Sequence, residues 1–116
     1  MKLLIAGSRS ITDFDLSPYI PKEVTEIISG GANGIDTLAE IYADKHKISK
    51  HIIRPEYQKY GNAAPIKRNH DMVDICDKVL VIWDGKSKGT ESTVKYAIKC
   101  QKEIILVNLS DLQKTE

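Results

Sequence analysis

The chain has 116 residues, and 17 lysines and arginines against 16 aspartates and glutamates give it a formal net charge of +1. This length suits a single domain over residues 1–116, because a chain of this size buries roughly 65% of the surface that its unfolded form exposes. The near-neutral charge excludes nucleic-acid binding that is driven by overall charge alone.

The beginning of the sequence and its cysteines bear on compartment and cofactors. The apolar run at residues 1–7 is too short for the hydrophobic region of a signal peptide or for a membrane span, so we expect a cytoplasmic protein. Cys76 and Cys100 lie apart on predicted helices, without the close spacing of a zinc site or a redox pair. We therefore expect reduced thiols, no metal site and no cofactor.

Apolar runs alternate with helical patterns along the chain. In order, strands are expected at residues 2–6, 26–29, 50–53, 79–83 and 103–107, and helices at 35–46, 66–75 and 90–100. Because the strand runs are continuously apolar, both faces of the sheet should be covered. The sequence therefore predicts an α/β fold, a three-layer, doubly wound parallel sheet of about five strands.

Three further segments are less regular. Thr12 followed by Asp15 could cap a short first helix within residues 12–20, a segment crowded by prolines. Residues 54–65 form a loop that is long for a compact domain, which predicts a lid over a binding crevice or an arm onto a partner. Tyr57 in this loop could stack on a base or pin the loop to the core. The polar residues 110–116 are expected to fray.

A glycine-rich turn joins the second predicted strand to a helix. It reads Ser29-Gly30-Gly31-Ala32-Asn33-Gly34-Ile35-Asp36, and the helix should begin at Gly34. Its small side chains would let backbone N–H groups and the positive end of the helix dipole attract an anion. The alternative is a tight connection without a ligand. Asp36 is as well suited to the helix dipole as to binding a ribose hydroxyl.

Polar or glycine-rich loops follow four of the strands, and ligands of open α/β sheets bind at the carboxyl ends of their strands. We therefore expect a crevice flanked by two helix N-termini. The other three loops are Gly7-Ser8-Arg9-Ser10, Arg54-Pro55-Glu56 and Asp84-Gly85-Lys86-Ser87-Lys88-Gly89-Thr90.

Basic and amide side chains near this edge are the candidate ligand-binding groups. Arg9 is expected to hold a phosphate, the alternative being a surface arginine. Lys67 and Arg68 begin a helix, where cations oppose the dipole, so they should face a ligand or a carboxylate. Asn69 could bind the ligand or cap the preceding loop.

These motifs, together with Tyr60-Gly61-Asn62-Ala63-Ala64-Pro65, follow in the order seen in the SLOG superfamily, which the chain resembles over residues 2–107. The resemblance is closest to its small stand-alone branch related to YspA and YpsA. It implies a Rossmann-like fold with strand order near 3-2-1-4-5 and a nucleotide or nucleotide-derived ligand at this edge. The ligand-binding residues that the motifs and the resemblance together indicate are Gly7, Ser8, Arg9, Ser29, Gly30, Gly31, Ala32, Gly34, Asp36, Arg68, Asn69, Asp84, Gly85, Ser87, Gly89 and Thr90.

Three functions are open, of which a nucleotide sensor or binding module is preferred. The Lonely Guy phosphoribohydrolases are similar and suggest an N-glycosidic hydrolase, but Thr93 stands at the position of their glutamate, which leaves Glu91 as the candidate catalytic carboxylate. The DNA-processing protein of bacterial transformation is similar in the residue 29–36 turn and suggests single-stranded DNA binding. An aromatic content of 6% argues against that reading.

The chain is also expected to form a homo-oligomer, a dimer being the simplest. Relatives of this size usually self-associate, and the helix expected at residues 66–75 carries Met72, Val73 and Ile75. These offer more apolar surface than one stripe packed on a sheet requires.

Overall fold

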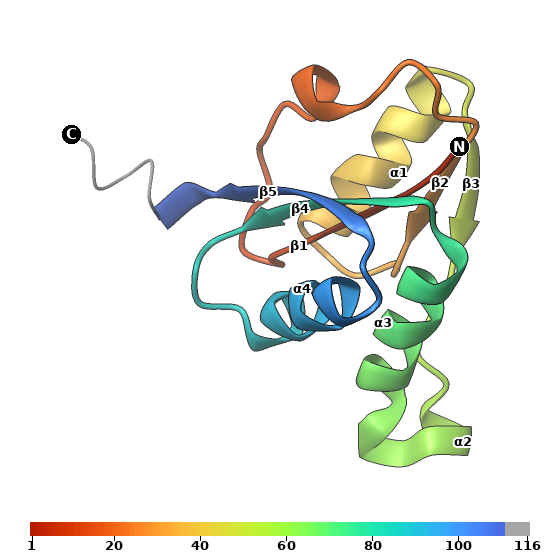
Figure 1. Ribbon diagram of the computed structural model, residues 1–116, viewed down its shortest axis with the longest axis vertical. Coiled ribbons are helices and arrows are strands. Elements are labelled where there is room, and N and C mark those ends of the chain that lie inside the picture. The colour runs from red at the N-terminus through yellow and green to blue at the C-terminus, as the bar shows by residue number, and fades with distance from the viewer. Residues whose placement is uncertain (111–116) are drawn as a thin grey trace.

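The apolar runs form one parallel sheet in the computed structural model, which describes residues 1–110 (Figure 1). The sheet order is β3-β2-β1-β4-β5, which confirms the expected fold and strand order. The predicted tail at 110–116 lies, from residue 111 on, outside the described residues. The strands are β1 (Lys2–Gly7), β2 (Glu26–Ser29), β3 (Ser49–Ile52), β4 (Lys78–Trp83) and β5 (Glu103–Asn108).

Helices cover both faces of the sheet, as the continuously apolar strands require. Figure 1 shows α1 on one face and α3 with α4 on the other, while α2 projects beyond the end of α3. The helices are α1 (Ile35–Lys45), α2 (Tyr57–Tyr60), α3 (Ala64–Ile75) and α4 (Lys88–Lys99). None of the helices within residues 1–110 is long and apolar enough to cross a membrane.

The core has two halves because successive strand residues point to opposite faces. Leu3 and Ile5 of β1 pack into the half that contains α1, and Leu4 packs into the half that contains α3 and α4. All three side chains are fully buried. The central strand β1 is therefore held from both sides, and its carboxyl end is a rigid base for the loop that follows.

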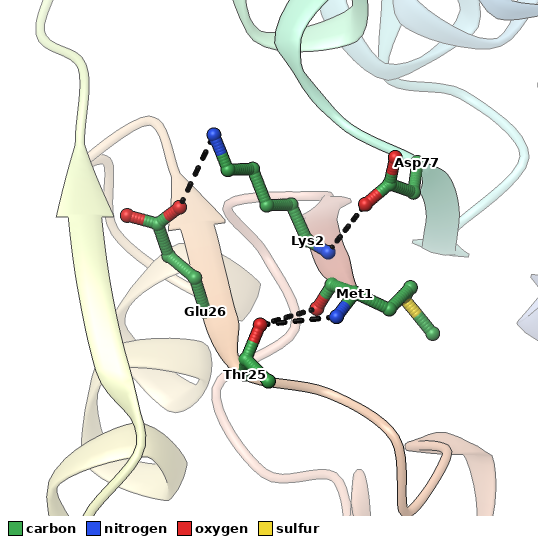
Figure 2. Close-up of polar contacts among 5 residues, drawn as sticks. All are labelled: Met1, Lys2, Thr25, Glu26 and Asp77. Atoms are coloured by element: carbon green, nitrogen blue, oxygen red, sulfur yellow. Dashed lines mark hydrogen bonds and ion pairs between the residues drawn. The ribbon is translucent and has the colours of Figure 1, made fainter.

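The amino-terminal end of β1 is fixed by polar contacts at the sheet edge opposite that loop (Figure 2). Lys2 N donates to Asp77 Oδ2 at 2.7 Å, and Asp77 N donates back to Lys2 O at 2.8 Å. The nitrogen of Met1 donates to Thr25 Oγ1 at 3.0 Å. These bonds join the beginnings of β1, β2 and β4 and thereby help to fix the register of the central strands.

Two local predictions are wrong. The segment 12–20 forms only a 3₁₀ turn at Ser17–Tyr19, and the residue before it, Leu16, provides no side-chain cap. Asp15 instead accepts a hydrogen bond from Ser17 N, and Pro18 restricts the backbone of the turn. The segment expected to be a loop at 54–65 contains α2 and a 3₁₀ turn at Gly61–Ala63, and α3 begins within it at Ala64. Pro65 does not prevent this, because the N–H that proline lacks would have no partner within the first turn of a helix.

Fewer apolar side chains of α3 are exposed for self-association than the sequence suggested. Met72 and Val73 are 3% and 0% exposed and pack into the core, whereas Ile66 and Ile75 remain exposed. The apolar surplus on this helix is therefore smaller than the sequence suggested. Self-association stays a prediction.

Cys76 is buried and Cys100 partly buried, and both are free thiols. Within residues 1–110, no group of three or more histidine, cysteine, aspartate or glutamate residues is arranged to hold a metal ion.

Candidate functional site

The candidate site lies where the strand order reverses, between β1 and β4. In doubly wound sheets the loops at this point diverge to opposite faces and leave a crevice at the carboxyl ends of the strands. Here the loops after β1, β2 and β4 converge on Ser8, whose side chain is fully buried.

Ser8, in the loop after β1, is bonded to β4, to the beginning of α1 and to the loop after β4. Its N–H donates to Ile82 O at 3.1 Å, and its carbonyl accepts from Ile35 N, at the beginning of α1, at 3.4 Å. Its Oγ accepts from Asp84 N at 3.0 Å. Ser8 was a predicted ligand-binding residue, but these bonds occupy it within the protein, so it holds the site in shape.

Two adjacent hollows, which share three lining residues, form the site. A wider cleft of about 410 Å³ is lined by Gly30, Gly31, Asn33, Arg54, Pro55 and Tyr57. A narrower cavity of about 100 Å³ reaches past Gly7 and Asp36 to the beginning of α4. Arg9, Ala32 and Arg68 line both, so these residues mark the junction. The crevice expected between the starts of α1 and α4 is therefore present.

Two of the predicted ligand-binding glycines, Gly7 and Gly34, have a structural role. A Cβ on Gly34 would clash with backbone atoms of Ser8 and Arg9, and a Cβ on Gly7 would lie 2.6 Å from Ile35 Cγ1. Gly34 also has φ of 76°. These two glycines therefore let protein segments approach one another closely, instead of leaving space for a ligand.

Gly30 and Gly31 are packed against the arginines of the site. A Cβ on Gly30 would lie 2.7 Å from Arg68 Nη1, and one on Gly31 would lie 2.6 Å from Arg54 Nη1. Gly31 also has φ of 73°, which side chains rarely adopt. Substituting either glycine would therefore disturb the protein as well as any ligand.

Arg68 is a buried side chain of α3 that braces the turn after β2. Its Nη1 donates to Gly30 O, and its Nε donates to Asn69 Oδ1 at 2.9 Å. Arg68 and Asn69 are 8% and 7% exposed. Burial lowers the pKa of Arg68, and the nearby Asp36 charge opposes this effect. Arg68 therefore faces both a carbonyl and a carboxylate, in agreement with the expectation from its helix position.

Asp36, in the first turn of α1, is the buried carboxylate of the site. It is 8% exposed, and its Oδ2 accepts from Ala32 N at 3.1 Å. Burial raises the pKa of Asp36, against the lowering effects of that hydrogen bond and of the Arg68 and Arg9 charges. The side chain thus braces the turn and also lines the narrower cavity. Ser29 supports the same turn, since its Oγ donates to Asp36 O at 3.3 Å.

The loop after β4 is organised by Asp84. Its Oδ1 accepts from Lys86 N and Ser87 N, both at 2.8 Å, and its Oδ2 accepts from Ser10 Oγ at 2.8 Å. The bonds from Ser87 and Lys86 hold the pKa of Asp84 down at about 2. Asp84 is therefore occupied by its own loop. The φ of 82° at Gly85 completes this turn.

The beginning of α4 opens onto the narrower cavity. Ser87 precedes the helix but, within residues 1–110, provides no side-chain cap; its Oγ instead lies 3.2 Å from Thr90 Oγ1. A Cβ on Gly89 would meet no described atom within 4 Å. An uncapped helix start carries N–H donors and positive potential, so this end of the cavity favours an anion.

Arg9, Arg54 and Tyr57 face the wider cleft. All three are exposed, and Arg54 Nη1 donates to Gly31 O at 3.2 Å, which fixes its position beside the turn. Arg54 was not among the predicted ligand-binding residues, although its position in the loop after β3 was the available signal. Together with Arg68 these arginines give the junction a positive potential.

Glu91, the predicted catalytic carboxylate, lies outside the two hollows. It pairs with Lys95 at 2.8 Å and lines a separate open groove of about 540 Å³ beside His70 and Tyr96. The residue of α4 that faces the narrower cavity is Thr93, whose Oγ1 donates to Gly89 O at 3.2 Å. The groove is larger, but its polar groups lie at the surface. We therefore place the site at the crevice, where Asp36, Arg68, Asn69 and Thr93 are buried.

Searches against protein-family models, curated proteins and solved structures return no match to this chain.

Because Asp84 accepts hydrogen bonds from its own loop, its contribution to the free energy of unfolding depends on pH. Asp84→Ala should lower the free energy of unfolding by ~1 kcal/mol at pH 7, because two backbone N–H groups lose their acceptor. A carboxylate whose folded pKa lies below its unfolded value stabilises the fold above the unfolded pKa and loses that contribution as pH falls. The difference from wild type should therefore shrink between pH 4 and the pKa of about 2.

Urea unfolding over this pH range measures that difference. Asp84→Asn, which keeps an acceptor but no charge, is the matched control and should be less destabilised at pH 7. A difference between wild type and Asp84→Ala that stays constant from pH 7 to pH 2.5 would contradict the assigned role.

Proposed function

We propose that this chain binds a nucleotide or a nucleotide-derived ligand in the crevice at the carboxyl edge of the sheet, as a sensor or binding module. The observation that carries the proposal is that the two hollows lie side by side and share Arg9, Ala32 and Arg68. The narrower cavity ends at the uncapped start of α4, and the wider cleft contains an exposed tyrosine. The resemblance to the SLOG superfamily supports the same reading.

The two hollows match the two chemically different ends of a nucleotide. A phosphate fits the narrower cavity, where Gly89 leaves the backbone accessible and Arg9 supplies a cation. The wider cleft, at about 410 Å³, falls within the range of roughly 300–1,000 Å³ typical of small-molecule pockets. Tyr57 is 57% exposed there and presents a ring on which a base can stack.

The charges of the lining groups agree with an anionic ligand. Within residues 1–110, the titratable groups along the two hollows include Arg9, Arg54 and Arg68 but only one carboxylate, that of Asp36. A cleft lined mainly by one sign of charge concentrates ligands of the opposite sign. The chain as a whole is nearly neutral, so this is a local property and favours a small anion over a long nucleic acid.

An N-glycosidic hydrolase is the second candidate, and the position of Glu91 argues against it. Such an enzyme needs a carboxylate near the anomeric carbon while basic groups hold the phosphate. Glu91 is paired with Lys95 in the separate groove, and the α4 side chain at the cavity is the uncharged Thr93. The arrangement therefore offers groups for binding but not the α4 carboxylate that the resemblance to the phosphoribohydrolases requires. The carboxylate that lines the cavity, Asp36, comes from α1 and accepts a hydrogen bond from Ala32 N.

Arg9→Ala should weaken binding of a nucleoside monophosphate by ~1.5–3 kcal/mol, because a hydrogen bond between two charged groups is lost. Isothermal titration calorimetry measures this effect. The corresponding nucleoside, which has no phosphate, should bind wild type and variant equally. The exposed Lys22 lies outside the crevice, so Lys22→Ala is the control for a general loss of positive charge. Equal affinity of Arg9→Ala and wild type for the monophosphate would show that Arg9 does not bind the phosphate.

Gly89→Val tests whether the start of α4 receives the phosphate. The added side chain has free space in the protein, so thermal unfolding should change little, while the methyl groups narrow the cavity and should reduce affinity at least tenfold. Ser92→Val, on the same helix but facing the separate groove, is the matched control. Unchanged affinity in Gly89→Val would exclude this end of the cavity.

Little or no free base should appear when the protein is incubated with purine and pyrimidine monophosphates, because Glu91 is not placed at the cavity. Chromatography of the reaction mixtures checks this. Rapid base release that disappears in Glu91→Gln would show that the protein is a hydrolase and overturn the binding-module assignment.

A further inference from the structure

Asp36 has an oxygen that the protein itself does not use. Among residues 1–110, its hydrogen bond to Ala32 N engages Oδ2 only. No buried side-chain oxygen or nitrogen in the described part of the chain lacks a partner, so Oδ1 is accessible. Because the side chain is 8% exposed and lines the narrower cavity, that access is through the cavity.

Asp36 lines the narrower cavity and not the wider cleft, so its place relative to the proposed ligand follows from its bonding partner. Its bonding partner Ala32 lines both the wider cleft and the narrower cavity, as do Arg9 and Arg68. A ligand with its phosphate at α4 and its base at Tyr57 carries its sugar across this junction. Asp36 therefore faces the part of the ligand that joins the phosphate to the base.

The chemistry of a carboxylate restricts what can lie against it. An ionised carboxylate only accepts hydrogen bonds, and it repels a second anion at close range. The group against Oδ1 must therefore be a neutral or cationic donor. The sugar of a ribonucleotide supplies such donors as its 2′- and 3′-hydroxyls, whereas a 2′-deoxyribonucleotide has one fewer.

We propose that Asp36 is the specificity-determining residue for the sugar and makes the crevice selective for ribonucleotides over 2′- or 3′-deoxyribonucleotides. This inference rests on the proposed nucleotide function. A site built to hydrogen-bond a hydroxyl rejects an analogue that lacks it, because the buried acceptor is then left without a partner.

The wild-type protein provides the first arm of the test, which needs no variant. Calorimetric titration compares adenosine, guanosine, cytidine and uridine monophosphates with their 2′-deoxy and 3′-deoxy counterparts. At least one ribonucleotide should bind roughly tenfold or more tightly than one of its deoxy forms, as expected for a hydrogen bond to a charged acceptor. Affinities within twofold across every set would overturn the inference.

The second arm uses Asp36→Asn, which keeps an oxygen that can accept from Ala32 N but removes the charge. The preference for the ribonucleotide should fall to within about twofold. Asp44→Asn, at the far end of the same helix and paired with Lys50, is the matched control and should keep it. A preference that persists in a folded Asp36→Asn protein would assign sugar recognition to another group.

The two proposals fail in different ways. If none of these monophosphates binds, the nucleotide function and the role of Asp36 are both wrong. If they bind through Arg9 but without regard to the sugar hydroxyls, only the role of Asp36 is wrong.

Discussion

The hydrogen bonds of Ser8 are the constraint on which the crevice depends. Through its N–H, carbonyl and Oγ, this buried residue joins the end of β4, the beginning of α1 and the loop of Asp84. Gly34 makes this possible, because its missing side chain lets α1 begin directly against the Ser8–Arg9 backbone. These contacts join the loops on either side of the crevice, so the proposed ligand would meet a preformed crevice.

The fold could be predicted from the sequence because its signals are local and repeated. Continuous apolar runs such as residues 79–83 require cover on both faces, and the alternation with helical patterns then specifies a parallel sheet. Strand order followed from the family resemblance instead. The predictions at residues 12–20 and 54–65 were wrong because short turns depend on tertiary contacts and on single prolines more than on periodicity.

The sequence located the loops of the site but not the roles of their residues. Glycines that indicated space for an anion turned out to accommodate the backbone of Ser8 or the side chains of Arg54 and Arg68, a distinction that depends on distances between segments far apart in the chain. The separation of Glu91 from the cavity agrees with sequence spacing, since Glu91 precedes Thr93 by two residues and two residues rotate a helix position by roughly 200°. The open start of α4 and the free Oδ1 of Asp36 became visible only in three dimensions.

We propose that the crevice between the loops after β1, β2 and β4 holds the ligand. Amide chemical shifts of the ¹⁵N-labelled protein, followed during titration with adenosine monophosphate and the other three ribonucleoside monophosphates, test it most directly. We expect saturable shifts for at least one nucleotide at Gly30, Gly31, Ala32, Gly89 and Thr90. Shifts confined to the groove beside His70 and Lys95, or no saturable shifts with any of the four, would contradict it.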